Sequence, residues 1–244
     1  YWYIIGFVGV FCSFIILSYY SVVAGWILHY VFLSVTNSLS ALSADDLNGT
    51  YQLLTSNAYL SSFWMIVVML LTALVVLGGV EKGIEKYSKI LMPLLFAIIV
   101  LMSIRSLTLP GSFSGLEFLF KPDFSKISPR IVIEALGQAC FSLSIGMAVM
   151  ITYGSYIAKN QSLTKTSFSV AFTDTLIATL AAVTIFPAAF AFNIDPGQGP
   201  GLVFVTLPNI FNQMFLGGFF AILFYILFVI AALISSISLL EVVV

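Results

Sequence analysis

Residues 131–158, IVIEALGQACFSLSIGMAVMITYGSYIA, carry the pattern that decides the fold. The stretch is apolar and long enough to cross a bilayer as a helix, which takes ~20 residues. Its middle, 137–146, is crowded with glycine, serine and other small residues. Such residues allow close packing between helices. They also allow a break in a helix whose freed backbone groups line a cavity, and the pattern leaves both interpretations open.

Five further stretches are apolar and long enough to span a membrane. They lie near residues 3–35, 58–79, 88–104, 166–192 and 215–241, the third continuing through Pro93. Hydrophobic residues make up 61% of the 244 positions and charged residues only 8%, against roughly 25% charge in a soluble domain. Because lipid offers no partner to an open sheet edge, we predict an all-α, polytopic membrane bundle in a single transmembrane domain, 1–244.

The connections between these stretches differ in basic residues. The short links 80–89 and 159–165 contain lysines, whereas 36–57 and 193–214 contain no Lys or Arg. Cytoplasmic loops of membrane proteins are enriched in Lys and Arg. We therefore expect the lysine-bearing links inside and 36–57, 105–130 and 193–214 as extracellular loops, although 105–130 is itself basic.

Several function classes are disfavoured by composition. The formal net charge is −1 without a basic run, which argues against nucleic-acid binding. His29 is the single histidine and lies at the end of an apolar stretch, and Cys12 and Cys140 lie inside apolar runs. These residues favour an interfacial histidine and two small core hydrophobes. They do not suggest a metal site or an intramembrane enzyme.

Three acidic residues fall within apolar stretches: Glu134, Asp174 and Glu241. A charge at the centre of a membrane helix costs at least ~2.5 kcal/mol, so it needs a partner. Glu134 and Glu241 lie near helix ends, where a water-facing or structural role is favoured. Asp174 lies about two turns inside its helix and is the best candidate for a cation ligand. The alternative is a carboxylate hydrogen-bonded to a neighbouring helix.

The segment AALISSIS, residues 231–238, is the third polar feature within an apolar stretch. Ala231 and Ser235 are four residues apart and share a helix face. A backbone carbonyl and a hydroxyl there would suit Na⁺, and close packing of small residues is the competing interpretation.

Five strings in this order and spacing give the chain a family resemblance: LSYYSVVAGW (17–26), GIEKYSKILMP (83–93), GQACFSLSIGMAVMITYGSY (137–156), FTDTLIATLAAVTIFPAAFAF (172–192) and AALISSISLLE (231–241). The chain resembles the bacterial branch of the neurotransmitter:sodium symporters, which have the LeuT fold of two inverted five-helix repeats. The resemblance implies a fragment covering transmembrane helices 3 to 8 of twelve. Helices 1 and 2 would precede Tyr1, and helices 9 to 12 would follow Val244.

The resemblance also implies a break of the 131–158 helix near 141–147 and roles for individual residues. Those expected to bind substrate are Ile16, Tyr20, Phe141, Ser142, Ser144 and Met147. Tyr20 would contact the substrate carboxylate and form a lid with Phe141. Ser142 and Asp174 would belong to a first sodium site, where cation and substrate carboxylate offset each other's charge.

A second sodium site is implied at Ala231 and Ser235, but Ile234 stands where the family usually has Thr or Asp, so an oxygen ligand is missing there. Gln138 resembles an outer-gate residue and Tyr156 an inner-gate residue. Gly83 and Pro93 match a spaced pair that lets the inner end of a helix unwind, since glycine tolerates the opened geometry and proline removes a backbone donor.

The implied function is sodium-coupled symport of a hydrophobic amino acid across the bacterial inner membrane by alternating access, with one or two Na⁺ ions. Met147 stands where relatives selective for small substrates often have Phe, and its flexibility suits larger side chains. The alternative is a membrane sensor that binds amino acids without flux. The sequence leaves the chloride requirement and the oligomeric state open.

Overall fold

The computed structural model describes residues 2–40, 42–157, 161–192 and 199–244. Within these ranges the secondary structure is helical, without a strand. Its elements are α1 (Trp2–Val35), α2 (Ala44–Ser56), α3 (Ala58–Leu77), η1 (Val80–Glu85), α4 (Lys86–Leu107), α5 (Ser112–Phe120), η2 (Phe124–Lys126), α6 (Pro129–Ser142), α7 (Val149–Tyr156), α8 (Leu163–Ala191), η3 (Leu202–Thr206), α9 (Leu207–Gln213) and α10 (Gly217–Val243).

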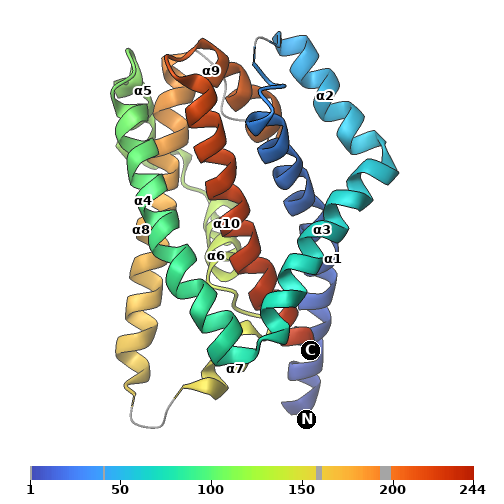
Figure 1. Cartoon of the computed structure of the whole chain (residues 1–244). Coiled ribbons are helices and arrows are strands. Elements are labelled where there is room, and N and C mark those ends of the chain that lie inside the picture. The colour runs from blue at the N-terminus through green and yellow to red at the C-terminus, as the bar shows by residue number, and fades with distance from the viewer. Residues whose placement is uncertain (1, 41, 158–160, 193–198) are drawn as a thin grey trace.

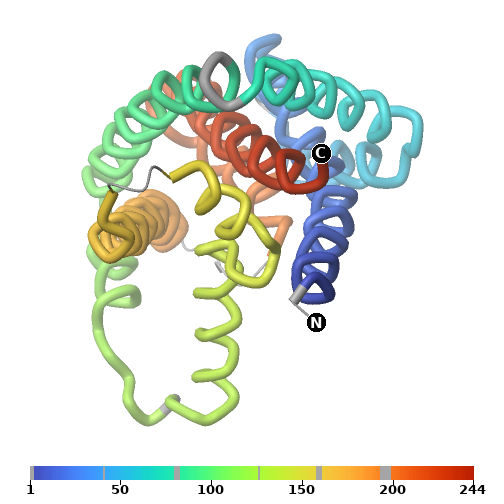
Figure 2. Tube along the Cα trace, turned by 90° about the horizontal axis from the view of Figure 1, so that it is seen from below, coloured from blue at the N-terminus to red at the C-terminus, as the bar shows by residue number. Residues whose placement is uncertain are grey.

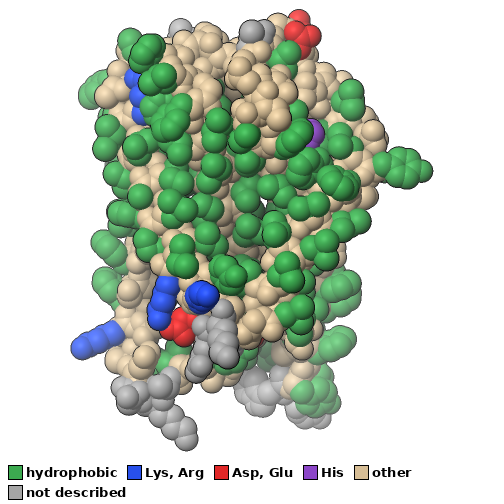
Figure 3. All heavy atoms as spheres, in the orientation of Figure 1, with side chains coloured by type: hydrophobic (Ala, Val, Ile, Leu, Met, Phe, Trp, Pro, Cys, Tyr) green, Lys and Arg blue, Asp and Glu red, His purple; other side chains and the backbone are tan. Residues whose placement is uncertain are grey.

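Five helices of the described chain are long and apolar enough to cross a membrane: α1, α3, α4 with the preceding turn, α8 and α10. Figure 1 shows them running between the two ends of a bundle. On the face drawn in Figure 3, hydrophobic side chains cover the flank and charged ones lie toward the ends. This distribution fits a protein whose flank contacts lipid, and the prediction of an all-α membrane bundle is confirmed.

Helix α10 organises the packing, because it contacts α1, α3, α4, α7 and α9. Tyr30 of α1 and Phe224 and Tyr225 of α10 are almost completely buried at this centre. Small residues let the helices approach closely, as is usual where lipid replaces water around a bundle. A Cβ at Gly25 would lie 2.7 Å from the amide nitrogen of Met65 in α3. Gly25 therefore fixes the close approach of α1 and α3.

Helices occur within all three segments that we predicted as extracellular loops. Segment 36–57 contains α2, segment 105–130 contains α5, and segment 193–214 contains η3 and α9. Helix α2 begins with a capping box, in which Ser43 and Asp46 each accept a hydrogen bond from the other's backbone amide. This Ser-x-x-acid signal is readable in the sequence. The loop interpretation missed it because the segment is too polar and short to span a membrane.

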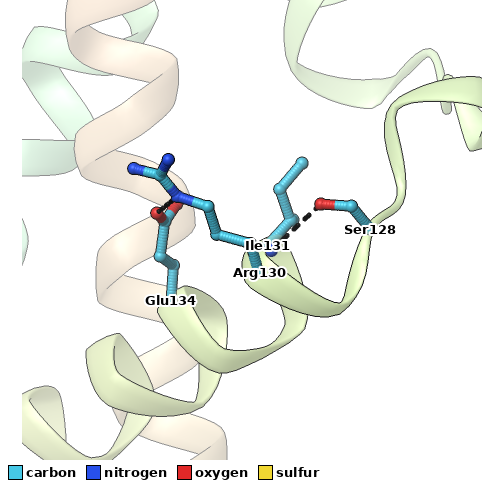
Figure 4. Close-up of polar contacts among 4 residues, drawn as sticks. All are labelled: Ser128, Arg130, Ile131 and Glu134. Carbon is cyan, nitrogen blue, oxygen red and sulfur yellow. Dashed lines mark hydrogen bonds and ion pairs between the residues drawn. The ribbon is translucent and has the colours of Figure 1, made fainter.

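In the segment that decides the fold, 131–158, the described residues form two short helices, α6 and α7, with a turn at 143–148 between them. Seen from below in Figure 2, α6 (yellow-green) lies across the direction of α8 (orange). Helix α6 follows Ser128, whose hydroxyl accepts a hydrogen bond from the Ile131 amide at 3.4 Å. Arg130 and Glu134 form an exposed ion pair of 2.8 Å one turn apart (Figure 4). Glu134 therefore has an exposed ion-pair partner, Arg130, at the start of its helix.

The ends of the bundle separate the connections into two groups. In Figure 1, α2, α5 and α9 lie toward one end, whereas the start of α4, α7 and the start of α8 lie toward the other. The loop charges predict this same grouping, and which end faces the cytoplasm stays a prediction. Lys159 and residues 193–198 lie outside the described residues.

Candidate functional site

A cavity of about 350 Å³ lies where α1, α6, α8 and α10 meet the turn between α6 and α7. We call it the central cavity. Its lining consists of Ile16, Tyr20, Gln138, Phe141, Ser142, Ser144, Met147, Val149, Asp174, Ile234, Ser235, Ser238 and Leu239. All six residues predicted to bind substrate are in this set, together with Gln138, Asp174 and Ser235. The fold thus gathers residues from distant parts of the chain, and their individual roles stay predictions.

The two ligands predicted for a first sodium ion are in direct contact. The Ser142 hydroxyl donates to the Asp174 carboxylate, at 2.8 Å from Oδ1 and 2.9 Å from Oδ2. Ser142 is the last residue of α6, so the helix end points its partial negative charge toward this place. A carboxylate, a hydroxyl and a helix-end carbonyl are the oxygen groups that membrane transporters use for Na⁺.

The backbone at the helix break leaves the carbonyl of Ser142 available. The amides of Leu143, Ser144 and Ile145 donate to the carbonyls of Ala139, Phe141 and Cys140, respectively. These bonds close the last turn of α6 onto residues before Ser142. The geometry therefore provides a second oxygen from Ser142 beside its hydroxyl.

The turn between α6 and α7 has an unusual backbone. Ser144 and Ala148 adopt positive φ angles of 54° and 57°, and Gly146 adopts 90°. Non-glycine residues rarely occupy this left-handed region, and where they do the surrounding structure must hold them there. Such a conformation separates the two half-helices and turns Ser144 and Met147 toward the cavity.

Helix α1 holds this turn in place. The Ser13 hydroxyl, which is fully buried, donates to the carbonyl of Met147. One turn away, a Cβ at Gly9 would lie 2.9 Å from the Cβ of Ala148. Sequence reasoning missed both residues, although glycine and serine four residues apart are a known signature of close helix contact.

The other wall of the central cavity is mostly apolar. Ile16 and Met147 contribute aliphatic surface, and Phe141, which is 47% exposed, contributes an aromatic ring. Tyr20 of α1 and Ser235 of α10 add one hydroxyl each to the lining. An apolar wall opposite an oxygen cluster suits a ligand with a charged end and an apolar end.

The two residues predicted for a second sodium site lie in different surroundings. Ser235 lines the central cavity, while Ala231 packs against the main hydrophobic core. Ile234 lies between them on the same helix and presents an aliphatic side chain to the cavity. Of the residues predicted for the second site, Ser235 therefore offers the one side-chain oxygen to the cavity, and Ser238 of α10 adds a further hydroxyl to the lining.

A second cavity of about 540 Å³ lies toward the end of the bundle that holds the start of α4. We call it the lower cavity. It is lined by Ile84, Glu85, Ser88, Met92, Tyr153, Tyr156, Ile157, Gln161, Ile234 and Ser238. The predicted inner-gate residue Tyr156 lies here, and its hydroxyl donates to Glu241 Oε1 at 2.6 Å. Glu241 thus has a partner, as its position near a helix end suggests.

Gly83 and Pro93 lie in or beside the helix that borders the lower cavity. Gly83 belongs to the π-helical turn η1, and a Cβ there would lie 2.0 Å from the carbonyl oxygen of Val75. Helix α4 runs through Pro93 without interruption. The start of α4 is therefore helical in the structure, and the unwinding of this segment stays a prediction.

The chain is similar to known membrane transporters. Residues 56–244 match the model of the sodium:neurotransmitter symporter family. The sodium-dependent transporter YhdH of Bacillus subtilis is 40% identical over 243 residues, covering 100% of this chain and 54% of its own length. A sodium-dependent transporter of Haemophilus influenzae is 41% identical over 248 residues, with the same coverage.

A solved structure shares the architecture as well as the sequence. The crystal structure of MhsT in complex with L-phenylalanine matches with a TM-score of 0.90 at 46% identity, covering 99% of this chain and 55% of that one. The chain therefore spans about half the length of the relatives it matches.

Proposed function

The chain belongs to the sodium:neurotransmitter symporter family, and we propose that the protein carrying it moves a hydrophobic amino acid across the membrane together with sodium. The predicted family and LeuT-type fold are both confirmed, and the chain is part of a multi-pass membrane protein. Its bacterial relatives support a location in the bacterial inner membrane.

The observation that carries this proposal is the Ser142–Asp174 contact in the wall of the central cavity. A carboxylate within a membrane-spanning helix needs a cation or a donor network. Ser142 supplies only one proton, so the carboxylate retains acceptor sites for a cation. Relatives of this chain are sodium-dependent transporters, which supports Na⁺ as that cation.

The shape of the central cavity supports an amino-acid substrate. The substrate carboxylate would lie between the sodium ion and the Tyr20 hydroxyl, and its side chain would lie against Ile16 and Met147. Ser144 would face the substrate from the break. MhsT, which shares 46% of the sequence, was crystallised with L-phenylalanine, which supports a large hydrophobic side chain.

The number of sodium ions is one or two in this proposal. Ser142 and Asp174 form the first site. Ser235 would contribute to a second site with the backbone of Ala231, and the aliphatic Ile234 removes a side-chain ligand from it. A second ion would therefore need oxygen ligands from elsewhere, including water.

Transport would proceed by alternating access. Sodium and substrate would draw Phe141 and Tyr20 together as a lid below Gln138. The lower side would then open at Tyr156, with Gly83 and Pro93 allowing the start of α4 to unwind. The sodium gradient supplies the energy, so the cycle needs no covalent chemistry.

The test uses the full-length protein reconstituted in liposomes, with uptake of labelled leucine and tryptophan measured with and without an inward sodium gradient. Accumulation that requires sodium, and that tyrosine competes for better than alanine, supports the proposal. Binding without gradient-driven accumulation would instead indicate the amino-acid sensor. Preference for alanine would contradict the hydrophobic substrate while leaving symport intact.

A further inference from the structure

The central and lower cavities meet at two residues of α10. Ile234 and Ser238 line both cavities, and they are one turn apart. Ile234 closes its part of the boundary with an aliphatic side chain. Ser238 is therefore the polar group at the boundary, placed where an ion moving between the cavities would pass.

The hydroxyl of Ser238 takes part in two hydrogen bonds. It accepts a hydrogen bond from the Tyr153 hydroxyl at 2.8 Å and donates one to the carbonyl of Ile234 at 3.1 Å. Tyr153 lies on α7 and lines the lower cavity. The pair thus closes the boundary with a phenol from one helix and a hydroxyl from another.

A second contact one turn away joins the same two helices. Tyr156 donates to Glu241 at 2.6 Å, and both residues are three positions beyond the first pair. Among the described residues, Tyr156 lines the lower cavity alone, and Glu241 lines neither cavity. The two contacts resemble each other chemically, but the Tyr153–Ser238 contact stands at the boundary.

Tyr153 has space into which it can withdraw. Its side chain also lines a third cavity of about 450 Å³ between α7 and α8, whose other lining residues are mostly apolar. At the neighbouring Gly154, a Cβ would meet nothing within 4 Å. A ring that borders two cavities can leave Ser238 without displacing packed side chains.

We propose that the Tyr153–Ser238 hydrogen bond is the closed partition between the central and lower cavities, and that its opening lets sodium pass along the Ser238 hydroxyl. The inference rests on the proposed sodium symport. When Tyr153 withdraws, the Ser238 oxygen loses its donor and becomes free to face a cation. A hydroxyl oxygen at this point replaces part of the ion's hydration at a boundary whose other residue, Ile234, is aliphatic.

The test measures access to the central cavity from the lower side. In the full-length protein with its native cysteines, Cys12 and Cys140 among them, replaced by alanine, Leu239→Cys places one thiol in the central cavity. Its rate of labelling is followed with a charged, membrane-impermeant methanethiosulfonate applied from the side of the lower cavity. Sodium-driven uptake and thermal stability are measured on the same proteins.

Tyr153→Phe and Ser238→Ala should each raise the labelling rate by about fivefold or more, the order expected for losing one hydrogen bond. Ser155→Ala is the control, because it removes a hydroxyl of the same helix, α7, that donates to the carbonyl of Thr152 and lines neither cavity. It should change the rate by less than about twofold.

Unchanged labelling in Tyr153→Phe and Ser238→Ala, or an equal rise in Ser155→Ala, would overturn the partition. If the parent protein nevertheless shows sodium-driven uptake, the symport proposal survives that result. If the parent shows no uptake while the two variants still open the passage, the symport proposal fails and the partition stands.

Discussion

The hydroxyl of Ser142 contacts both carboxylate oxygens of Asp174, at 2.8 Å and 2.9 Å. The contact joins the last residue of α6 to α8, beside the turn at 143–148 that separates α6 from α7. A hydroxyl that donates to a carboxylate can rotate its proton away, so that both groups present oxygen to a cation.

Replacing Ser142 with alanine should weaken sodium binding without removing it. The change deletes the hydroxyl oxygen and leaves the backbone carbonyl of residue 142 and the Asp174 carboxylate in place. We expect the sodium concentration for half-maximal uptake to rise about fivefold to tenfold, the effect of losing one polar contact to a charged group. Ser142→Thr retains the hydroxyl and is the control. If its sodium dependence of uptake shifted as far as that of Ser142→Ala, the role of the hydroxyl oxygen would be contradicted.

Ser13→Ala should impair the turn that forms the central cavity. Its hydroxyl is the donor that α1 provides to the carbonyl of Met147, so its loss leaves a buried acceptor without that partner, at a cost of ~1–3 kcal/mol. We expect lower substrate affinity and a lower melting temperature. Ser18→Ala, on the same helix, removes an exposed hydroxyl bonded to its own helix at Phe14. It should behave as the parent; similar losses in both variants would argue against a specific role for Ser13.

Gly25→Ala should destabilise the bundle. The added Cβ would lie 2.7 Å from the backbone of Met65, so α1 and α3 would have to separate. Overpacking of this kind costs ~1–3 kcal/mol. Gly6→Ala is the matched control on the same helix, where a Cβ meets nothing within 4 Å. Thermal unfolding in detergent should separate the two variants, and equal melting temperatures would mean that the helices do not approach as described.

Met147→Phe should shift preference toward smaller substrates. Met147 is buried in the wall of the central cavity, and a rigid ring there fills space that a flexible thioether can vacate. We expect tryptophan uptake to fall more than alanine uptake, by about tenfold in their ratio, within the range for steric discrimination in apolar pockets. Met150→Phe, which lines the third cavity, should leave the ratio unchanged. A constant ratio in both variants would remove Met147 from the specificity determinants.

Several parts of the fold and site were readable from the sequence because the signal lies within one segment. The apolar stretches predicted the long helices, and the small residues of 137–146 indicated a break as one of two possibilities. The break itself occurs at 143–148, where Ser144, Gly146 and Ala148 adopt positive φ angles. The isolated carboxylate of Asp174 likewise marked a place that needs a partner.

Other parts depend on how segments pack, which spacing along one chain does not encode. Tyr153 and Ser238 are 85 residues apart, and only the packing of α7 on α10 brings them together. The same holds for Ser13 and Met147, 134 residues apart. The resemblance placed Ala231 and Ser235 in one site. The fold turns Ser235 toward the central cavity and packs Ala231 into the core, as one helix can present neighbouring faces to different surroundings.

The most direct test of the cation site is the sodium dependence of labelled amino-acid binding to the full-length protein, compared between the parent and Asp174→Asn. The amide keeps the shape of the side chain and removes its charge. We predict that Asp174→Asn needs at least about tenfold more sodium for half-maximal binding, equivalent to ~1.4 kcal/mol. Asp45→Asn, an exposed carboxylate on α2, should match the parent. Superimposable sodium curves for the parent and Asp174→Asn would contradict the assignment of the Ser142–Asp174 pair as the cation site.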